Sequence, residues 1–171
     1  MIATGSAPIE LQLAKFDGKT VVSSTEALCF EEAPKRFLVI GAGAIGLELG
    51  SVWNRLGSEV TILELLPRIG HGFDLELSNL LQRALTSQGI NFHLETKVTG
   101  VKVENGRAVA TATKGNETLT FEADKVLVSV GRRPFSDGLG AEKVGVEFDE
   151  QKRIKVDKHF RTNVEGIYAI G

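Results

Sequence analysis

Residues Phe37–Glu64, with the sequence FLVIGAGAIGLELGSVWNRLGSEVTILE, predict a strand, a helix and a second strand in succession. The apolar run Phe37–Ile40 predicts a strand, and a second apolar run, Val60–Leu63, predicts another. Between them, apolar residues at helical spacing predict a helix, and Gly57 would end it. The predicted apolar stripe of this helix consists of Ile45, Leu49, Val52, Trp53 and Leu56, with Trp53 in the core.

Three glycines lie at the turn from the first strand into the helix. Gly41, Gly43 and Gly46 form G-x-G-x-x-G in the strand-to-helix context that dinucleotide-binding sites require. The first would make a tight turn, the second would let the backbone approach a pyrophosphate, and the third would let helix and strand pack closely. The N–H groups around Ala44 and Ile45 would then face the anion. A glycine-rich turn without a ligand is the less favoured alternative.

Glu64 ends the second strand, 23 positions after Gly41. A carboxylate about 20 residues after the first glycine accepts hydrogen bonds from the adenosine ribose and repels a 2′-phosphate. Leu65 and Leu66 follow, and Arg68 is the nearest cation. The sequence therefore favours NAD(H) over NADP(H), against the alternative that Glu64 is only a solvated charge at a strand end.

The position of Glu48 allows two interpretations. The residue lies within the first turns of the predicted helix, where an acidic side chain complements the helix dipole. It also flanks the predicted buried stripe, close to the expected ligand crevice. The residues alone leave both interpretations open.

The rest of the chain predicts an α/β protein with one parallel sheet and one small antiparallel sheet. Strand, helix and strand alternate through the first half, which indicates right-handed parallel crossovers. The period then changes to two, and Asn105-Gly106 is typical of a tight hairpin. The further predicted helices are 24–30 and a helix capped by Asp74 that reaches Gln88, with Leu77, Leu80, Leu81 and Leu85 as its stripe. The further predicted strands are 90–94, 98–104, 108–113, 119–121, 125–130, 154–156 and 167–170.

Composition limits the function classes. The 171 residues are 42% hydrophobic and 25% charged, which is ordinary for a globular domain. The net charge of -2 gives no reason to expect nucleic acid or an anionic membrane surface, and no apolar run reaches the length of a bilayer span. His71, His93 and His159 lack metal-ligand spacing, so we expect no metal site. For Arg132-Arg133, surface or structural ion pairing is favoured over phosphate binding. The single Cys29 favours a reducing compartment.

Together these residues resemble the NAD-binding domain of the dihydrolipoamide dehydrogenases, a family of flavoprotein pyridine nucleotide-disulfide oxidoreductases. The matching stretches are ATGSAP at 3–8, VVSSTEAL at 21–28, VIGAGAIGLELGSVWNRLGSEVTILE at 39–64, KVTGV at 97–101, VLVSVGRRPF at 126–135 and IYAIG at 167–171. Mercuric reductases and NADH oxidases share the shorter motifs, so they remain alternatives, as does a non-enzymatic NAD(H)-sensing module. The resemblance implies a Rossmann-like FAD/NAD(P)-binding fold, with a three-stranded antiparallel sheet on one face.

The resemblance also implies a domain organisation. Residues 1–23 would be the end of a first FAD-domain segment and linker, 24–150 the NAD-binding domain with a core of about 36–131, and 151–171 a return toward the FAD domain. The FAD-binding fingerprint, the redox disulfide and the catalytic His-Glu pair of the family have no counterpart in the sequence. We therefore expect this part of the protein to bind NAD(H) without catalysing the reaction, and FAD to belong to the full-length parent only.

Family roles transfer only to matching positions. Gly43, Ala44 and Ile45 would cradle the pyrophosphate, Gly41 and Gly46 would complete the cofactor-binding motif, and Glu64 would hold the adenosine ribose. Val98 would line the adenine side, and Glu48 with the backbone of Gly131 would position the nicotinamide. The parent would be a homodimer associated with 2-oxo acid dehydrogenase complexes through lipoyl domains. It would be cytoplasmic in a bacterium and in the mitochondrial matrix in a eukaryote.

Overall fold

A computed structural model describes residues 1–171. The chain forms two compact units, one of residues Ile9–Gly131 and one of Met1–Pro8 with Arg132–Gly171. The first unit contains the whole predicted core, 36–131. Residues 132–150, which we had assigned to the NAD-binding domain, group with the second unit. The assignment of the flanking segments to an FAD domain stays a prediction.

A parallel sheet of five strands forms the centre of the Ile9–Gly131 unit, in the order β2-β9-β3-β4-β5. The strands are β2 (Val21–Val22), β3 (Arg36–Ile40), β4 (Glu59–Leu63), β5 (Asn91–His93) and β9 (Lys125–Val128). Val39 of β3 lies opposite Ile62 on one side and Leu127 on the other. The predicted α/β class and the return of the chain to the parallel sheet are therefore confirmed.

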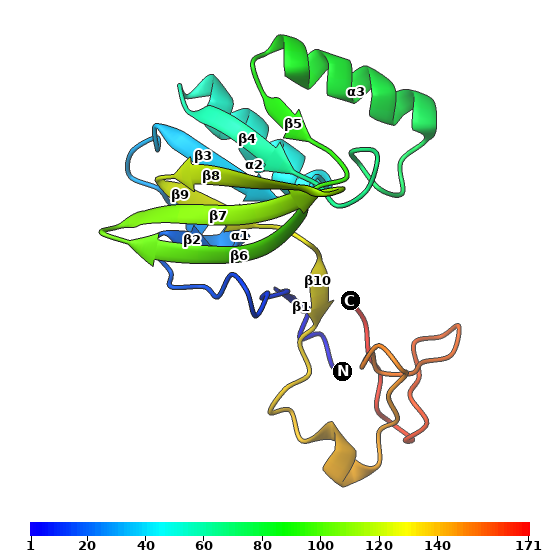
Figure 1. The fold of residues 1–171 in the computed structure, drawn as a ribbon. Coiled ribbons are helices and arrows are strands. Elements are labelled where there is room, and N and C mark those ends of the chain that lie inside the picture. Colours follow the sequence, from blue (N-terminus) through cyan, green and yellow to red (C-terminus); the bar gives the residue numbers. More distant parts are fainter. The chain divides into compact units, whose positions relative to one another are not determined.

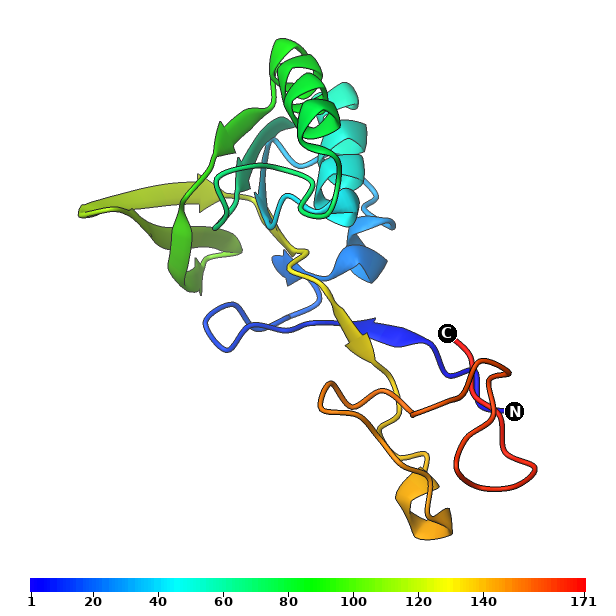
Figure 2. The same ribbon diagram turned by 90° about the vertical axis from the view of Figure 1, so that its right-hand side faces the viewer.

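Both faces of this sheet are covered. Alternate residues of each strand point to opposite faces, so Val39 packs against the helices while its neighbours Leu38 and Ile40 pack against the small antiparallel sheet. Figures 1 and 2 show helices α2 and α3 on one side of the parallel strands and β6–β8 on the other. The predicted Rossmann-like arrangement is confirmed, with the antiparallel sheet covering one face.

Three helices cover the first face: α1 (Ser24–Ala27), α2 (Ala44–Arg55) and α3 (Leu75–Ser87). Capping by Ser23 and Asp74 starts α1 and α3, and Gly57 follows α2 with a φ of 101°. The helix predicted over 24–30 is shorter, and ends at Ala27. Trp53 is buried as predicted, and its Nε1 donates to the carbonyl of Ala27 at 2.9 Å.

The predicted stripes were partly wrong. Val52 and Leu56 of α2 are exposed at 48% and 60%, and Leu77 and Leu80 of α3 at 60% and 53%. In α2, Gly46 and Gly50 lie in the interface and let the helix approach the sheet directly. The contact face of α2 therefore contains these two glycines together with Leu49 and Trp53 of the predicted stripe.

The antiparallel sheet consists of β6 (Lys97–Glu104), β7 (Arg107–Lys114) and β8 (Glu117–Ala123). Asn105 and Gly106 both have positive φ, 52° and 75°, as the predicted tight hairpin requires. Ala108, Ala110 and Ala112 of β7 are fully buried against the parallel sheet. These small side chains allow the two sheets to pack closely.

The second unit contains little regular structure. Strand β1 (Ser6–Pro8) pairs antiparallel with β10 (Arg132–Pro134), and a 3₁₀ turn, η1, spans Ala141–Val144. The strands predicted over 154–156 and 167–170 were wrong: Ile154, Tyr168 and Ala169 make only isolated bridges. No helix in the chain combines the length and apolar character that crossing a bilayer requires.

Candidate functional site

The candidate site lies at the carboxyl ends of β3, β4 and β9, where parallel α/β sheets bind their ligands. Three connections meet there: the glycine loop after β3, the loop after β4, and the residues after β9. The N–H of Gly41 donates to the carbonyl of Leu63, and the N–H of Ser129 donates to the carbonyl of Ile40, both at 2.8 Å. These bonds hold the three strand ends together.

Internal packing explains why two of the three motif positions must be glycine. Gly41 has a φ of 103°, and a Cβ there would lie 2.7 Å from the carbonyl oxygen of Ser129. A Cβ on Gly46 would overlap the carbonyl oxygen of Gly41 and lie 2.7 Å from the Ser129 Oγ. The fold alone therefore requires glycine at positions 41 and 46.

Gly43 differs, because nothing in the fold requires it. Its φ is -77°, which any residue adopts, and a Cβ there would meet no atom of the chain within 4 Å. Gly43 is also the N-cap of α2, and no side chain caps this helix end. Ala44 is exposed and Ile45 half-buried. An anion could therefore approach the first N–H groups of α2 closely, so the residues present fit a pyrophosphate.

Glu64 lies beside the glycine loop. Its Oε2 accepts from the N–H of Ala42 at 2.7 Å, and its Oε1 accepts from the N–H of Leu66 at 2.9 Å. The side chain is half-buried. A carboxylate has about four acceptor positions, so positions remain for the two hydroxyls of a ribose.

The other predicted residues lie around this centre. Glu48 is exposed on the second turn of α2, and its side chain makes no hydrogen bond or ion pair within the chain. Val98 is only 8% exposed, because its side chain packs between the two sheets. Gly131 has a φ of 130°, and its carbonyl accepts from the N–H of Ile9 at 3.1 Å. The roles predicted for these three residues stay predictions.

Sequence reasoning missed two contributors to the loop. The Oγ of Ser129 is 3.2 Å from the carbonyl oxygen of Ile40 and 3.1 Å from that of Gly41, so its hydroxyl ties β9 to the glycine loop. The N–H of Gly70 donates to the carbonyl of Ala42 at 2.8 Å, and the adjacent Ile69 is fully buried. Neither residue type signals such a role, but the buried Ile69 within a polar loop was a usable sign.

His93 lies next to Glu64 on the edge strand. Its carbonyl accepts from the N–H of Glu64 at 2.9 Å, and its ring meets that of Phe121 edge-on, with centroids 4.8 Å apart. Burial, together with the nearby Lys114 ammonium, lowers the pKa of the His93 imidazole below its ordinary value of 6.5.

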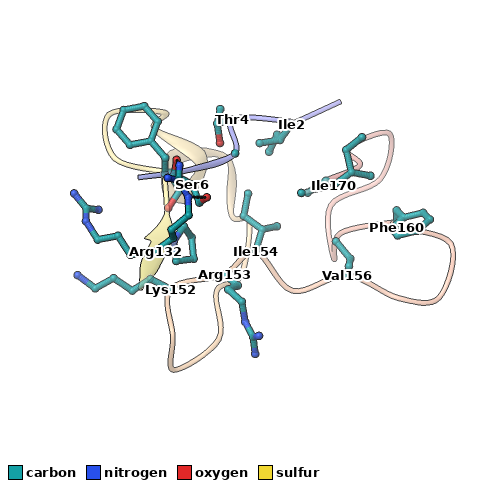
Figure 3. A pocket seen from close by; sticks show the side chains of 17 residues that line it. Ile2, Thr4, Ser6, Arg132, Lys152, Arg153, Ile154, Val156, Phe160 and Ile170 are labelled. Carbon is teal, nitrogen blue, oxygen red and sulfur yellow. Dashed lines mark hydrogen bonds between the residues drawn. The ribbon is translucent and has the colours of Figure 1, made fainter. Parts of the chain in front are cut away.

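A cavity lies in the second unit. It measures about 370 Å³, and Figure 3 shows the aliphatic side chains of Ile2, Ile154 and Val156 in its wall. Arg132 hydrogen-bonds to Ser6, and Arg133 forms an ion pair with Asp137 at 2.6 Å. The predicted ion pairing is therefore confirmed for Arg133, whereas Arg132 hydrogen-bonds to Ser6 and forms no ion pair; no residue of the glycine loop lines the cavity.

The sequence matches a known protein family and many of its members. The sequence model of the family described as pyridine nucleotide-disulphide oxidoreductase matches residues 1–171. Dihydrolipoamide dehydrogenase from Chaetomium thermophilum is 49% identical over 174 residues, covering the whole chain and 34% of that relative. Leghemoglobin reductase from Vigna unguiculata is 50% identical, covering the whole chain and 33% of that relative. The chain thus spans about a third of the length of these relatives.

Solved structures show the same relationship. LpdA from Mycobacterium tuberculosis matches with a TM-score of 0.89 at 27% identity, over 99% of this chain and 36% of that one. The flavoprotein disulfide reductase RclA from Escherichia coli matches with a TM-score of 0.84 at 26% identity, over 98% of this chain and 38% of that one. The resemblance inferred from the motifs is confirmed, and the chain belongs to the pyridine nucleotide-disulphide oxidoreductase family.

Proposed function

We propose that residues 9–131 bind NAD(H) and serve as the NAD-binding domain of a dihydrolipoamide dehydrogenase. The observation that carries this proposal is Gly43: the fold does not require glycine there, whereas a pyrophosphate lying against the start of α2 does. The family match and the identity of 49% to a dihydrolipoamide dehydrogenase support it.

In this proposal the chain binds and orients the cofactor. The N–H groups of Ala44 and Ile45, at the positive end of α2, receive the pyrophosphate. Glu64 accepts from the ribose hydroxyls with its remaining acceptor positions, and its charge repels the 2′-phosphate of NADP(H). Glu48 and the backbone of Gly131 lie toward the nicotinamide, and the segment around Val98 toward the adenine. The nicotinamide ring itself supplies the hydride chemistry.

The parent activity is part of the proposal. FAD and a redox disulfide in the rest of the protein would oxidise dihydrolipoamide, and the nicotinamide would receive the hydride. Because dihydrolipoamide dehydrogenases and leghemoglobin reductases match equally well, at 49% and 50% identity, these residues do not distinguish the two parent activities. The shared step is reaction with NAD(H).

We further propose a homodimeric parent that meets lipoyl domains of 2-oxo acid dehydrogenase complexes. Relatives from Dictyostelium discoideum and Pisum sativum carry the name dihydrolipoyl dehydrogenase, mitochondrial. They support a matrix location if the source is a eukaryote, whereas a bacterial protein would be cytoplasmic.

A titration tests the proposal. NADH fluorescence followed while the 171-residue chain is added should show saturable binding, and NADPH should bind more weakly. The same chain should show no lipoamide-dependent turnover. An absence of saturable NADH binding by the folded chain would contradict the proposed function. Turnover would contradict the expectation that FAD and the redox disulfide, which the rest of the protein supplies, are needed for the reaction.

A further inference from the structure

The Glu64 side chain joins two loops through hydrogen bonds within the chain. Its Oε2 holds the N–H of Ala42 in the glycine loop at 2.7 Å, while its Oε1 holds the N–H of Leu66 in the following loop at 2.9 Å. Each oxygen thus serves a different segment. A residue that only bound ribose would not need either bond.

The Ala42 peptide is held from both sides. Glu64 accepts from its N–H, and the N–H of Gly70 donates to its carbonyl at 2.8 Å. Ala42 is 1% exposed, so water cannot replace either partner without movement of the loop. A buried N–H that loses its acceptor costs the desolvation of that group.

A third segment is connected to the same place through the backbone. The carbonyl of Leu66 accepts from the N–H of Glu95 at 3.2 Å, and the carbonyl of Glu64 accepts from the N–H of Thr96 at 2.8 Å. Glu95 adopts a φ of 55°, which non-glycine residues rarely do, so these bonds hold an unfavourable conformation. The segment that leads into Val98 is therefore fixed relative to Glu64.

We infer that Glu64 is a latch as well as a ribose ligand: its carboxylate sets the shape of the glycine loop before the dinucleotide arrives. This inference rests on the proposed function for its ligand, whereas the two hydrogen bonds of the latch lie within the chain. It follows that cofactor preference and loop order are coupled in this chain. A substitution that changes the preference at position 64 also releases Ala42.

Amide hydrogen exchange of the ligand-free chain, resolved by residue, tests the latch. In Glu64→Ala the amides of Ala42 and Leu66 should exchange about tenfold faster or more than in the wild type, because both lose their acceptor. In Glu64→Gln the single carboxamide oxygen can serve one of the two N–H groups, so only one amide should speed up. Glu64→Gln also keeps the test usable if Glu64→Ala does not fold.

Glu95→Ala is the matched control. It removes a carboxylate from the same loop cluster, but the Glu95 side chain makes no hydrogen bond within the chain, and alanine is strained by the same φ. Exchange at Ala42 should then equal that of the wild type. Unchanged exchange at both amides in the Glu64 variants would overturn the latch, and equal acceleration in Glu95→Ala would show a general charge effect and overturn it as well.

Binding of 2′,3′-dideoxy-ADP separates the latch from the ribose contact. This ligand retains a diphosphate but lacks the hydroxyls that Glu64 would hold. Glu64→Ala should weaken its binding by roughly 2- to 10-fold through the disordered loop. Equal dissociation constants would overturn the coupling. If the wild-type chain binds neither this ligand nor NADH, the proposed function fails, while the exchange rates still decide the latch.

Discussion

The hydroxyl of Ser129 lies 3.1 Å from the carbonyl oxygen of Gly41, which ties the end of β9 to the first turn of the glycine loop. The same Oγ would lie 2.7 Å from a Cβ on Gly46. The glycine loop, the start of α2 and the residue after β9 are therefore in close contact around the Ser129 side chain. This packing leaves no room for a Cβ on Gly41 or Gly46, whereas a Cβ on Gly43 would meet no atom of the chain within 4 Å.

Gly46→Ala should destabilise the chain strongly. Alanine inside a helix normally gains about 1 kcal/mol over glycine, but here its Cβ would overlap the Gly41 carbonyl, which is backbone and cannot rotate away. We expect a net loss of about 1–3 kcal/mol or more in unfolding free energy. Urea denaturation checks this value. A variant as stable as the wild type would mean that the helix does not approach the sheet as described.

Glu64 should determine cofactor preference. Glu64→Ala removes charge-assisted ribose contacts worth about 1.5–3 kcal/mol in NADH binding. Glu64→Arg should lower NADH affinity further and raise NADPH affinity, because an arginine attracts the 2′-phosphate that a carboxylate repels. Calorimetry with both cofactors measures the ratio. The ribose assignment fails if Glu64→Arg leaves both affinities unchanged.

Glu48 should affect the nicotinamide end and not the adenine end. Glu48→Ala should weaken NADH by about 1 kcal/mol more than ADP-ribose, which lacks the nicotinamide. If Glu48 only complements the helix dipole, the variant instead loses about 0.3–1 kcal/mol of stability and both ligands respond alike. Titrating the two ligands on both proteins, with melting midpoints as the stability measure, separates the two roles.

The stability of the chain should fall as the pH drops below 6.5, partly because of His93. Burial lowers the pKa of this imidazole in the folded chain below the value of 6.5 that it has when unfolded. The unfolded state therefore binds the proton first, and the unfolding free energy decreases as the pH falls through this interval. His93→Gln should flatten the decrease between pH 7 and pH 5. A decrease as steep in His93→Gln as in the wild type would contradict this attribution.

The sequence predicted the elements of the Ile9–Gly131 unit well because local signals mark them. The glycine motif, Asp74, Gly57 and the Asn105-Gly106 turn each fix a backbone conformation within a few residues, and all four lie where predicted. Strand β2 was missed because Val21 and Val22 are too few to show a period.

Burial was harder to predict, because packing partners lie far apart in the sequence. The α2 stripe was wrong at Val52 and Leu56, since Gly46 and Gly50 make the contact with the sheet and a glycine gives no hydrophobic signal. For the candidate site, spacing singled out Glu64, whereas Ser129 was passed over although it lies within the matching stretch 126–135, because its contact with the glycine loop joins residues 88 positions apart in the sequence.

NADH titration of the wild-type chain beside Gly43→Ala, with unfolding free energies for both, decides whether a pyrophosphate binds at the start of α2. The added Cβ meets no atom of the chain within 4 Å, so we expect only the loss of about 1 kcal/mol that replacing an N-cap glycine entails. NADH binding should weaken at least about tenfold, because the methyl group lies where the pyrophosphate must approach. Equal NADH affinity in the two folded proteins, or no saturable binding by the wild type, would contradict the account.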